Sequence, residues 1–296
     1  MSWITAAILA TILFTLCVIF DKFFGSKKIK SVYSFAILLN IIYFPFTFIT
    51  AYIMRDTFKL SLGVLYSFLA GASWFTMWIF YWKALQKGEP SRVAAVFFTS
   101  PIFSALLGLI FLNEGLSLFK WAGIVTIVLG AVLSSLGGES HKRDTKVAYL
   151  FALIAAVFAA IGNALSKFAM ADLPPLMVNC VAYFTTIPFY IFLLKDRLVS
   201  TEVKNSLKNV RMLGQFIFRG ILGYGAIMLN MTAMGLGTVS LVVAIGGSQP
   251  ILILLISLLL SVLFPHMIHE ELGKKTLLPK LAALVLTVAG VVMISV

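Results

Sequence analysis

The chain has 296 residues, of which 61% are hydrophobic, 14% aromatic and only 11% charged. Its mean hydropathy is +1.04, whereas an ordinary soluble domain is about 45–50% apolar and about 25% charged. Such a chain has too few polar residues to cover a water-soluble core, which excludes a soluble enzyme, a nucleic-acid-binding protein and a receptor with a large domain outside the membrane. The net charge of +12 then indicates loops that face the anionic lipids of a cytoplasmic leaflet.

Ten apolar runs of helical length follow one another along the chain, and a membrane-spanning helix needs about 20 apolar residues. The first run lacks a basic start and a small-residue cleavage site, so we interpret it as a retained span and not as a signal peptide. The runs also lack the alternation of a membrane barrel. The prediction is an all-α membrane protein with spans at Ser2–Phe20, Ser31–Met54, Leu62–Ala84, Ser91–Leu112, Ser117–Leu136, Val147–Met170, Pro175–Leu194, Met212–Gly235, Thr238–Phe264 and Thr276–Val296.

Basic residues concentrate in the odd-numbered connections between these spans. Those connections contain most of the 23 Lys and Arg residues, among them Lys27, Lys28, Arg143 and Lys208. Cytoplasmic loops of membrane proteins carry an excess of Lys and Arg. We therefore predict a multi-pass protein with its odd loops in the cytoplasm and both termini outside.

The two halves of the chain share landmarks in the same order. Ala84 precedes Pro101 by the spacing that separates Ala233 from Pro250. Each half has five predicted spans, an odd number, so the second copy enters the membrane from the opposite side. Inverted repeats of this kind are a common plan of secondary transporters, which bind substrate where the repeats meet. The predicted units are a five-helix repeat at 1–138, a basic linker at 139–146 and a second five-helix repeat at 147–296.

One stretch of the first half resembles the EamA repeat of the drug/metabolite transporter (DMT) superfamily. It has a proline in one helix at Pro101, the turn Glu114-Gly-Leu-Ser after it, and glycines such as Gly130 in the next helix. The resemblance covers the chain in two copies, although Glu270 and Glu271 follow their proline at a longer distance. It implies ten helices around a central cavity, alternating access and export of a metabolite, and we expect a prokaryotic cell membrane.

Charged residues inside spans cost about 2.5–3.5 kcal/mol at a helix centre and are functional candidates by default. Arg219 lies within the eighth span, where its guanidinium could hold a carboxylate or phosphate or could reach the headgroups. Lys22 and Lys167, at corresponding ends of spans one and six, could be gating cations or interfacial anchors. Asp21 could pair with Lys22 or with a basic residue across the bundle. Glu114 could carry charge at a gate or close a turn.

The third span carries an aromatic stripe. Trp74, Trp78 and Tyr81 recur at helical spacing and share one face. They are candidates to line a substrate cavity, with helix packing or an interfacial belt as the alternative. In the corresponding eighth span, Tyr224 and Asn230 are the polar candidates, among glycines that allow close helix approach.

Two prolines, Pro101 and Pro250, lie within long spans at corresponding positions. A proline removes one helical hydrogen bond and frees a carbonyl that can bind solute, water or an ion. Neighbouring hydroxyl groups could instead satisfy that carbonyl and leave a simple packing kink. The further residues that we predict at these helix breaks and the adjoining substrate site are Ser100, Gly246, Gly247, Ser248 and Gln249.

The first span contains no interior Asp or Glu. Small multidrug-resistance proteins, distant relatives in the superfamily, depend on a carboxylate there, which argues against a pump for lipophilic cations. The interior cations favour a small anionic or zwitterionic metabolite, such as an amino acid or organic acid. A nucleotide-sugar or sugar-phosphate carrier is the alternative, and a drug efflux pump is less favoured.

The sequence predicts a transporter and not an enzyme, because no catalytic pair of side chains is apparent within the spans. No phosphate-binding loop is visible, so a proton or another solute gradient is the expected driving force. His266 and His269 have helical metal-ligand spacing but no third cluster joins them. We therefore predict no metal and no cofactor, and only a small-molecule substrate and the lipid bilayer as partners.

Overall fold

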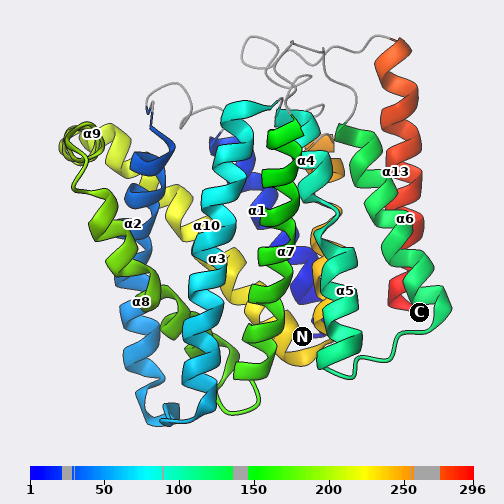
Figure 1. Cartoon of the computed structure of the whole chain (residues 1–296), viewed down its shortest axis with the longest axis horizontal. Coiled ribbons are helices and arrows are strands. Elements are labelled where there is room, and N and C mark those ends of the chain that lie inside the picture. Colours follow the sequence, from blue (N-terminus) through cyan, green and yellow to red (C-terminus); the bar gives the residue numbers. More distant parts are fainter. Residues whose placement is uncertain (22–28, 30, 89, 136–145, 254, 257–273) are drawn as a thin grey trace.

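The computed structural model describes residues 1–21, 29, 31–88, 90–135, 146–253, 255–256 and 274–296, and within these ranges it contains helices and turns but no strand. Figure 1 shows the long helices side by side, with both chain termini toward the lower end. The all-α class is therefore confirmed for the described residues. The helices are α1 Trp3–Phe20, α2 Val32–Ile53, the short 3-10 helix η2 Arg55–Thr57, α3 Leu62–Lys87, α4 Pro90–Phe97, α5 Ser100–Phe111, α6 Leu118–Ser135, α7 Lys146–Ala169, α8 Pro175–Leu193, α9 Arg197–Lys208, α10 Val210–Leu236, α11 Val239–Gly246 and α13 Lys274–Ser295.

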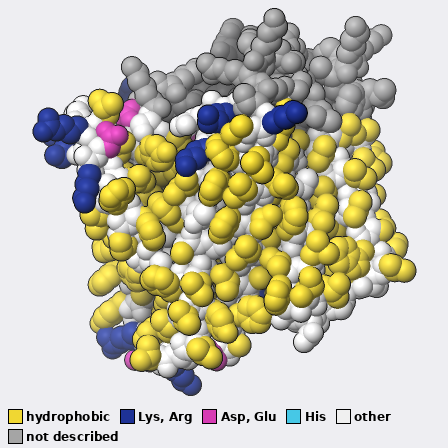
Figure 2. Space-filling view, in the orientation of Figure 1, with side chains coloured by type: hydrophobic (Ala, Val, Ile, Leu, Met, Phe, Trp, Pro, Cys, Tyr) yellow, Lys and Arg dark blue, Asp and Glu magenta, His cyan; other side chains and the backbone are white. Residues whose placement is uncertain are grey.

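Seven helices in the described part of the chain are long and apolar enough to cross a membrane. Three shorter apolar helices accompany them, at Leu118–Leu133, Val239–Ile253 and Ala282–Ser295. The prediction of a multi-pass helical membrane protein is thereby confirmed, and the number of ten spans stays a prediction. Figure 2 shows hydrophobic side chains over the middle of one face and Lys and Arg side chains toward its ends, as expected of a surface in contact with lipid.

Capping residues mark the ends of the long helices. Asn209 begins α10, because its Oδ1 accepts a hydrogen bond from the Met212 amide at 3.1 Å and satisfies a donor without a partner in the first turn. At their other ends, α3 and α10 both stop at a glycine. The amide of Gly88 donates to the Ala84 carbonyl at 2.9 Å, and the amide of Gly237 donates to the Ala233 carbonyl at 2.8 Å.

The predicted connection Lys195–Arg211 contains a helix, α9, that the search for apolar runs missed. Asp196 begins it, because its Oδ1 accepts the Leu198 amide at 2.8 Å. Val199 and Val203 are buried against α2, while the exposed side chains of α9 include Arg197, Lys204 and Lys208. An amphipathic helix with so polar a face contains no long apolar run, and it therefore escapes a search for membrane spans.

Small residues bring α3, α7 and α8 into close contact. Alanines on α7, among them Ala155 and Ala160, are 0% exposed. A Cβ atom added at Gly162 would lie 3.1 Å from the indole nitrogen of Trp74, and one added at Gly71 of α3 would overlap the Ala182 carbonyl of α8. Because lipid tails are as apolar as the side chains, helices in a membrane associate through such close packing.

Candidate substrate site between α1, α2, α8 and α10

A partly buried ion pair joins α1 to α10. The Nε of Arg219 donates to Asp21 Oδ1 at 3.0 Å, and its Nη2 donates to Oδ2 at 2.9 Å. The two side chains are 13% and 24% exposed, respectively. The guanidinium of Arg219 thus points toward another helix, and its predicted role in substrate binding stays a prediction. The structure pairs Asp21 with a basic residue across the bundle; Lys22 lies outside the described residues.

Tyr43 of α2 completes the surroundings of Arg219. Its hydroxyl accepts a hydrogen bond from Nη1 of Arg219. This contact depends on Gly223, because a Cβ atom there would overlap the Tyr43 hydroxyl and lie 2.6 Å from Nη1. The thiol of Cys17 also faces the backbone of α10, with Sγ 3.9 Å from the Arg219 carbonyl oxygen. The guanidinium of α10 is thus held by side chains from α1 and α2.

Further tyrosines extend this polar cluster through the apolar bundle. The Tyr224 hydroxyl donates to Thr50 Oγ1 at 2.8 Å, and the Tyr224 ring lies 6.3 Å from that of Tyr43 between centroids. Tyr183 of α8 donates to the backbone carbonyl of Asn40 in α2. The sequence identified Tyr224 but missed Tyr43 and Tyr183. Their positions well inside apolar spans, away from the interfacial ends where tyrosine is usual, were the available signal.

The second predicted cation, Lys167, binds the end of a helix. Its Nζ donates to the carbonyls of Met234 at 2.7 Å and Gly237 at 2.8 Å. The last carbonyls of a helix have no partner within it, and a cation there also interacts favourably with the helix dipole. Lys167, on α7, therefore holds the C-terminal end of α10.

Glu114 binds the beginning of the next helix. Its Oε1 accepts the Val239 amide at 2.7 Å, and its Oε2 accepts the Ser240 amide at 3.2 Å and the Ser240 hydroxyl at 2.6 Å. The residue is 8% exposed. A carboxylate at a helix N-terminus satisfies free amides and complements the dipole. Together, Lys167 and Glu114 hold the turn between α10 and α11.

The two proline-containing spans are both interrupted just before the proline. α4 ends at Phe97 before α5 begins at Ser100, and α11 ends at Gly246. The breaks meet, because a Cβ atom at Gly247 would lie 3.3 Å from Pro101 Cγ. Ser248 donates to the Ile245 carbonyl at 2.6 Å, so a hydroxyl satisfies a carbonyl at this break.

The other residues predicted at these breaks differ in exposure. Ser100 is 8% exposed, and Gln249 and Pro250 are half-buried. A Cβ atom at Gly246 would meet no atom within 4 Å, so open space adjoins that backbone. The predicted role of the breaks as hinges and in substrate binding stays a prediction.

The aromatic stripe of α3 faces several neighbours. Trp74 packs against Ala155 and Ala159 of α7, and Tyr81 packs against Phe97 at 4.8 Å between ring centroids. Trp78 is the exposed member of the stripe, at 42%. Trp74 and Tyr81 therefore contribute to helix packing, and the prediction that the stripe lines a cavity stays a prediction.

Asn230 of α10 is half-buried. Its Nδ2 lies 3.7 Å from the sulfur of Met234 on the same helix, so the structure does not bring it to Arg219. Among the described residues, no group of three or more His, Cys, Asp and Glu side chains could hold a metal ion; His266 and His269 lie outside those residues.

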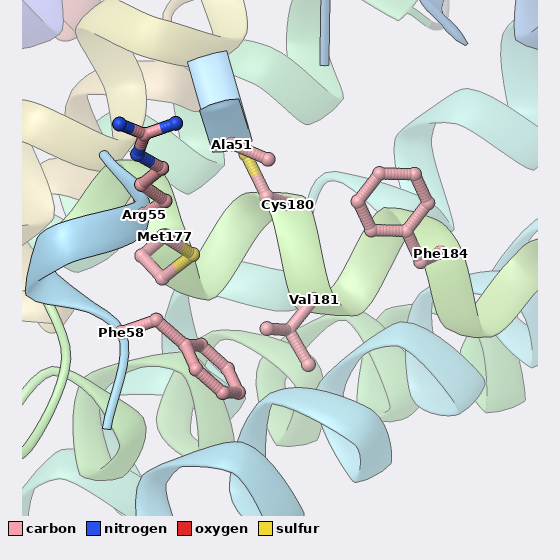
Figure 3. Close-up of a pocket in the computed structure, with 7 residues that line it drawn as sticks. All are labelled: Ala51, Arg55, Phe58, Met177, Cys180, Val181 and Phe184. Carbon is pink, nitrogen blue, oxygen red and sulfur yellow. The ribbon is translucent and has the colours of Figure 1, made fainter. Parts of the chain in front are cut away.

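A pocket of about 270 Å³ lies between the lower ends of α2 and α8, lined by Ala51, Arg55, Phe58, Met177, Cys180, Val181 and Phe184. Figure 3 shows these side chains, of which Arg55 is the charged one. None of the residues predicted from the sequence lines it. Cys180 also approaches the Thr47 carbonyl, with its Sγ at 3.6 Å. The pocket is mainly apolar and is separate from Arg219, so we do not assign the substrate to it.

These features define a multi-pass helical membrane protein with a polar cluster between its helices. Comparison with known proteins identifies the family to which it belongs. A model of the EamA-like transporter family matches residues 1–136 and 146–296. The chain therefore belongs to the EamA-like transporter family, part of the DMT superfamily. This membership supports a transporter role and points away from an enzyme.

One protein is similar in sequence and one in fold. The chain is 37% identical over 65 residues to a Sinorhizobium sp protein named "Uncharacterized transporter in cobO 3'region", a match that covers 22% of this chain and 46% of that relative. The fold matches a solved structure described as "Crystal structure of protein" with a TM-score of 0.73 and 18% identity, over 98% of this chain and 94% of the other. At that identity the likeness shows the fold alone.

Proposed function

We propose that this protein is a secondary active transporter of a small anionic or zwitterionic metabolite, an amino acid or organic acid, with Arg219 as the group that binds its carboxylate. The observation that carries the proposal is the enclosure of one guanidinium among Asp21, Tyr43 and the neighbouring tyrosines. An arginine presents paired N–H groups that match a carboxylate. Export is the expected direction in this family.

The interior carboxylates argue against lipophilic cations as substrates. Asp21 is bound by Arg219, and Glu114 is bound by three donors at the start of α11. A cationic drug would need a carboxylate free to receive it. Lys167 binds two backbone carbonyls at the end of α10, whereas the partners of Arg219 are side chains. Side chains can move away to admit a substrate, so Arg219 is the better candidate of the two predicted interior cations.

The packing supports two inverted five-helix repeats, 1–138 and 147–296, moving by alternating access. Exchange of the halves pairs α1 with α7, α2 with α8, α3 with α10, α5 with α11 and α6 with α13. Under this exchange the contact of α3 with α7 becomes that of α10 with α1, and the contact of α3 with α8 becomes that of α10 with α2. The pairs α2–α8, α5–α11 and α6–α13 map onto themselves. This pairing supports the prediction of ten spans.

The same arrangement supports an orientation in the membrane. Figure 1 places both termini toward the lower end and α9 at the upper end. The basic side chains of α9, Arg197, Lys204 and Lys208, are exposed there. The excess of basic residues in cytoplasmic loops therefore supports a cytoplasmic upper end with both termini outside.

Ligand-induced thermal stabilisation of the purified protein in lipid nanodiscs tests the substrate class. The panel contains L-alanine, L-glutamate, succinate, UDP-glucose, glucose 6-phosphate and tetraphenylphosphonium. A ligand that binds only the folded state at 100 times its Kd stabilises by about 2.7 kcal/mol. We expect an amino acid or organic acid to stabilise the protein and Arg219→Gln to abolish the effect.

Arg55→Gln is the matched control, because Arg55 is an exposed arginine whose side chain is 62% accessible. It should respond to ligand as the wild type does. Stabilisation by UDP-glucose or glucose 6-phosphate alone would favour the nucleotide-sugar or sugar-phosphate alternative, since Arg219 suits phosphate equally well. Stabilisation by tetraphenylphosphonium alone would contradict the proposal. Counterflow of the stabilising compound in proteoliposomes then tests transport itself.

A further inference from the structure

Every nitrogen of the Arg219 guanidinium already has a partner in this structure. Asp21 occupies the edge formed by Nε and Nη2, at 3.0 and 2.9 Å, and Tyr43 occupies Nη1. A bound carboxylate would use the same paired geometry. Asp21 and the carboxylate of a substrate are therefore competitors for one edge of one side chain.

We propose that this competition couples substrate to protons: the substrate carboxylate displaces Asp21 from Arg219, and the displaced Asp21 takes up one proton from solvent. The inference rests on the function proposed above. One O–H bond forms on Asp21 when the substrate binds and breaks when it leaves. The Arg219 guanidinium faces one ionised carboxylate in both states, so exchanging Asp21 for a substrate carboxylate leaves the charge next to the guanidinium unchanged.

The surroundings of Asp21 explain why displacement would bring protonation. The described groups that face the ion pair are Cys17 on α1, Tyr43 on α2 and, next to Tyr43, Tyr190 on α8. None of these described groups is a cation, so none of them could pair with an ionised Asp21 removed from Arg219, and a partly buried carboxylate without a counter-ion is unfavourable. Asp21 retains 24% exposure, which gives a proton access to it.

The corresponding interface of the other half lacks the pair. In the proposed exchange of halves, Ser166 of α7 corresponds to Asp21, and Ala70 of α3 corresponds to Arg219. Ser166 is 2% exposed and Ala70 is 0% exposed, and the Ser166 hydroxyl donates within its own helix to the Gly162 carbonyl at 2.8 Å. Two such helices therefore pack without an ion pair, so architecture alone does not require the charges between α1 and α10.

The test measures proton uptake and affinity together, with succinate, L-glutamate and L-alanine as probes and full-length protein in nanodiscs. In weakly buffered solution with a pH indicator, we expect about one proton to be taken up per probe molecule bound. Affinity should fall about tenfold per pH unit as pH rises, over a range in which the probe carboxylates stay ionised. Affinity falls and does not rise with pH because the complex binds one more proton than the free protein.

Asp21→Asn removes the competitor and the titrating group. This variant should bind the probes about tenfold or more tightly at high pH, because more of the protein has a free Arg219 edge. It should show neither proton uptake nor pH dependence. Asp56→Asn is the matched control, because Asp56 also lies near an arginine, 3.7 Å from Arg55, but is 90% exposed. It should behave as the wild type does.

An infrared readout separates this role from a structural one. With ¹³C-labelled succinate, the difference spectrum of the wild type should gain a protonated carboxyl band that Asp21→Asn lacks. The double variant Asp21→Asn, Arg219→Gln removes both charges, so it should fold and bind no probe. Binding to the wild type without proton uptake, with affinity unchanged in Asp21→Asn, would overturn the coupling and leave the substrate class standing. Failure of all three probes to bind would overturn both.

Discussion

Replacing Glu114 with Gln removes one negative charge and keeps the shape of the side chain. The carboxylate accepts three hydrogen bonds at the start of α11, at 2.7, 3.2 and 2.6 Å, from the amide of Val239 and the amide and hydroxyl of Ser240. A carboxamide has one oxygen, so its NH2 group would face the Ser240 amide, which is also a donor. Because Glu114 is 8% exposed, water cannot readily replace the lost acceptor.

The expected loss follows from those contacts. A hydrogen bond to a charged group contributes about 1.5–3 kcal/mol, and a carboxylate at a helix N-terminus contributes a further 0.3–1 kcal/mol or so through the dipole. With the Val239 bond retained, we expect Glu114→Gln to destabilise the protein by about 2–3 kcal/mol. For a chain of this size, that corresponds to a decrease of roughly 4–10 °C in Tm.

Thermal unfolding in nanodiscs, followed by circular dichroism, measures the decrease. Asp56→Asn is the control, since its carboxylate is 90% exposed and its loss should leave Tm unchanged. Ser240→Ala removes one of the three bonds and should cost about 1 kcal/mol. Its effect should couple with that of Glu114→Gln by at least about 0.5 kcal/mol. A Tm within about 1 °C of the wild type for Glu114→Gln would refute the assignment of Glu114 to the start of α11.

Three further substitutions test the packing around the site by the same unfolding measurement. Lys167→Met deprives two carbonyls at the end of α10 of their donor and should cost about 1–2 kcal/mol; an unchanged Tm would exclude that role. Gly71→Ala places a Cβ atom against the Ala182 carbonyl, which is backbone and cannot rotate away, so we expect a loss of about 1–3 kcal/mol. The control Gly214→Ala, at an exposed helical position with open space around it, should instead stabilise by about 0.5–1 kcal/mol.

The sequence predicted much of the helical architecture because that information is local. An apolar run long enough to cross a bilayer is visible in any window of about 20 residues, and the predicted start at Leu62 and the predicted start at Pro175 agree with α3 and α8. The prolines likewise marked the breaks before Ser100 and after Gly246. The helix α9 escaped because its signal is amphipathic and its overall composition is polar.

The partners of the charged residues could not be read in this way. Arg219 and Asp21 are far apart in sequence, and which of several carboxylates meets the guanidinium depends on α1 packing along α10. The same is true of Lys167 and Glu114, which bind backbone groups of the turn between α10 and α11. Backbone carbonyls and amides have no signature in the sequence, because every residue has them.

Composition and periodicity by themselves thus determined that this chain is a multi-pass helical membrane protein. Only the tertiary structure decided that its interior arginine is already bound to an aspartate and a tyrosine from two other helices. The physical reason is that hydrophobicity acts on each segment separately, whereas an ion pair in a membrane forms only between the helices that packing makes neighbours.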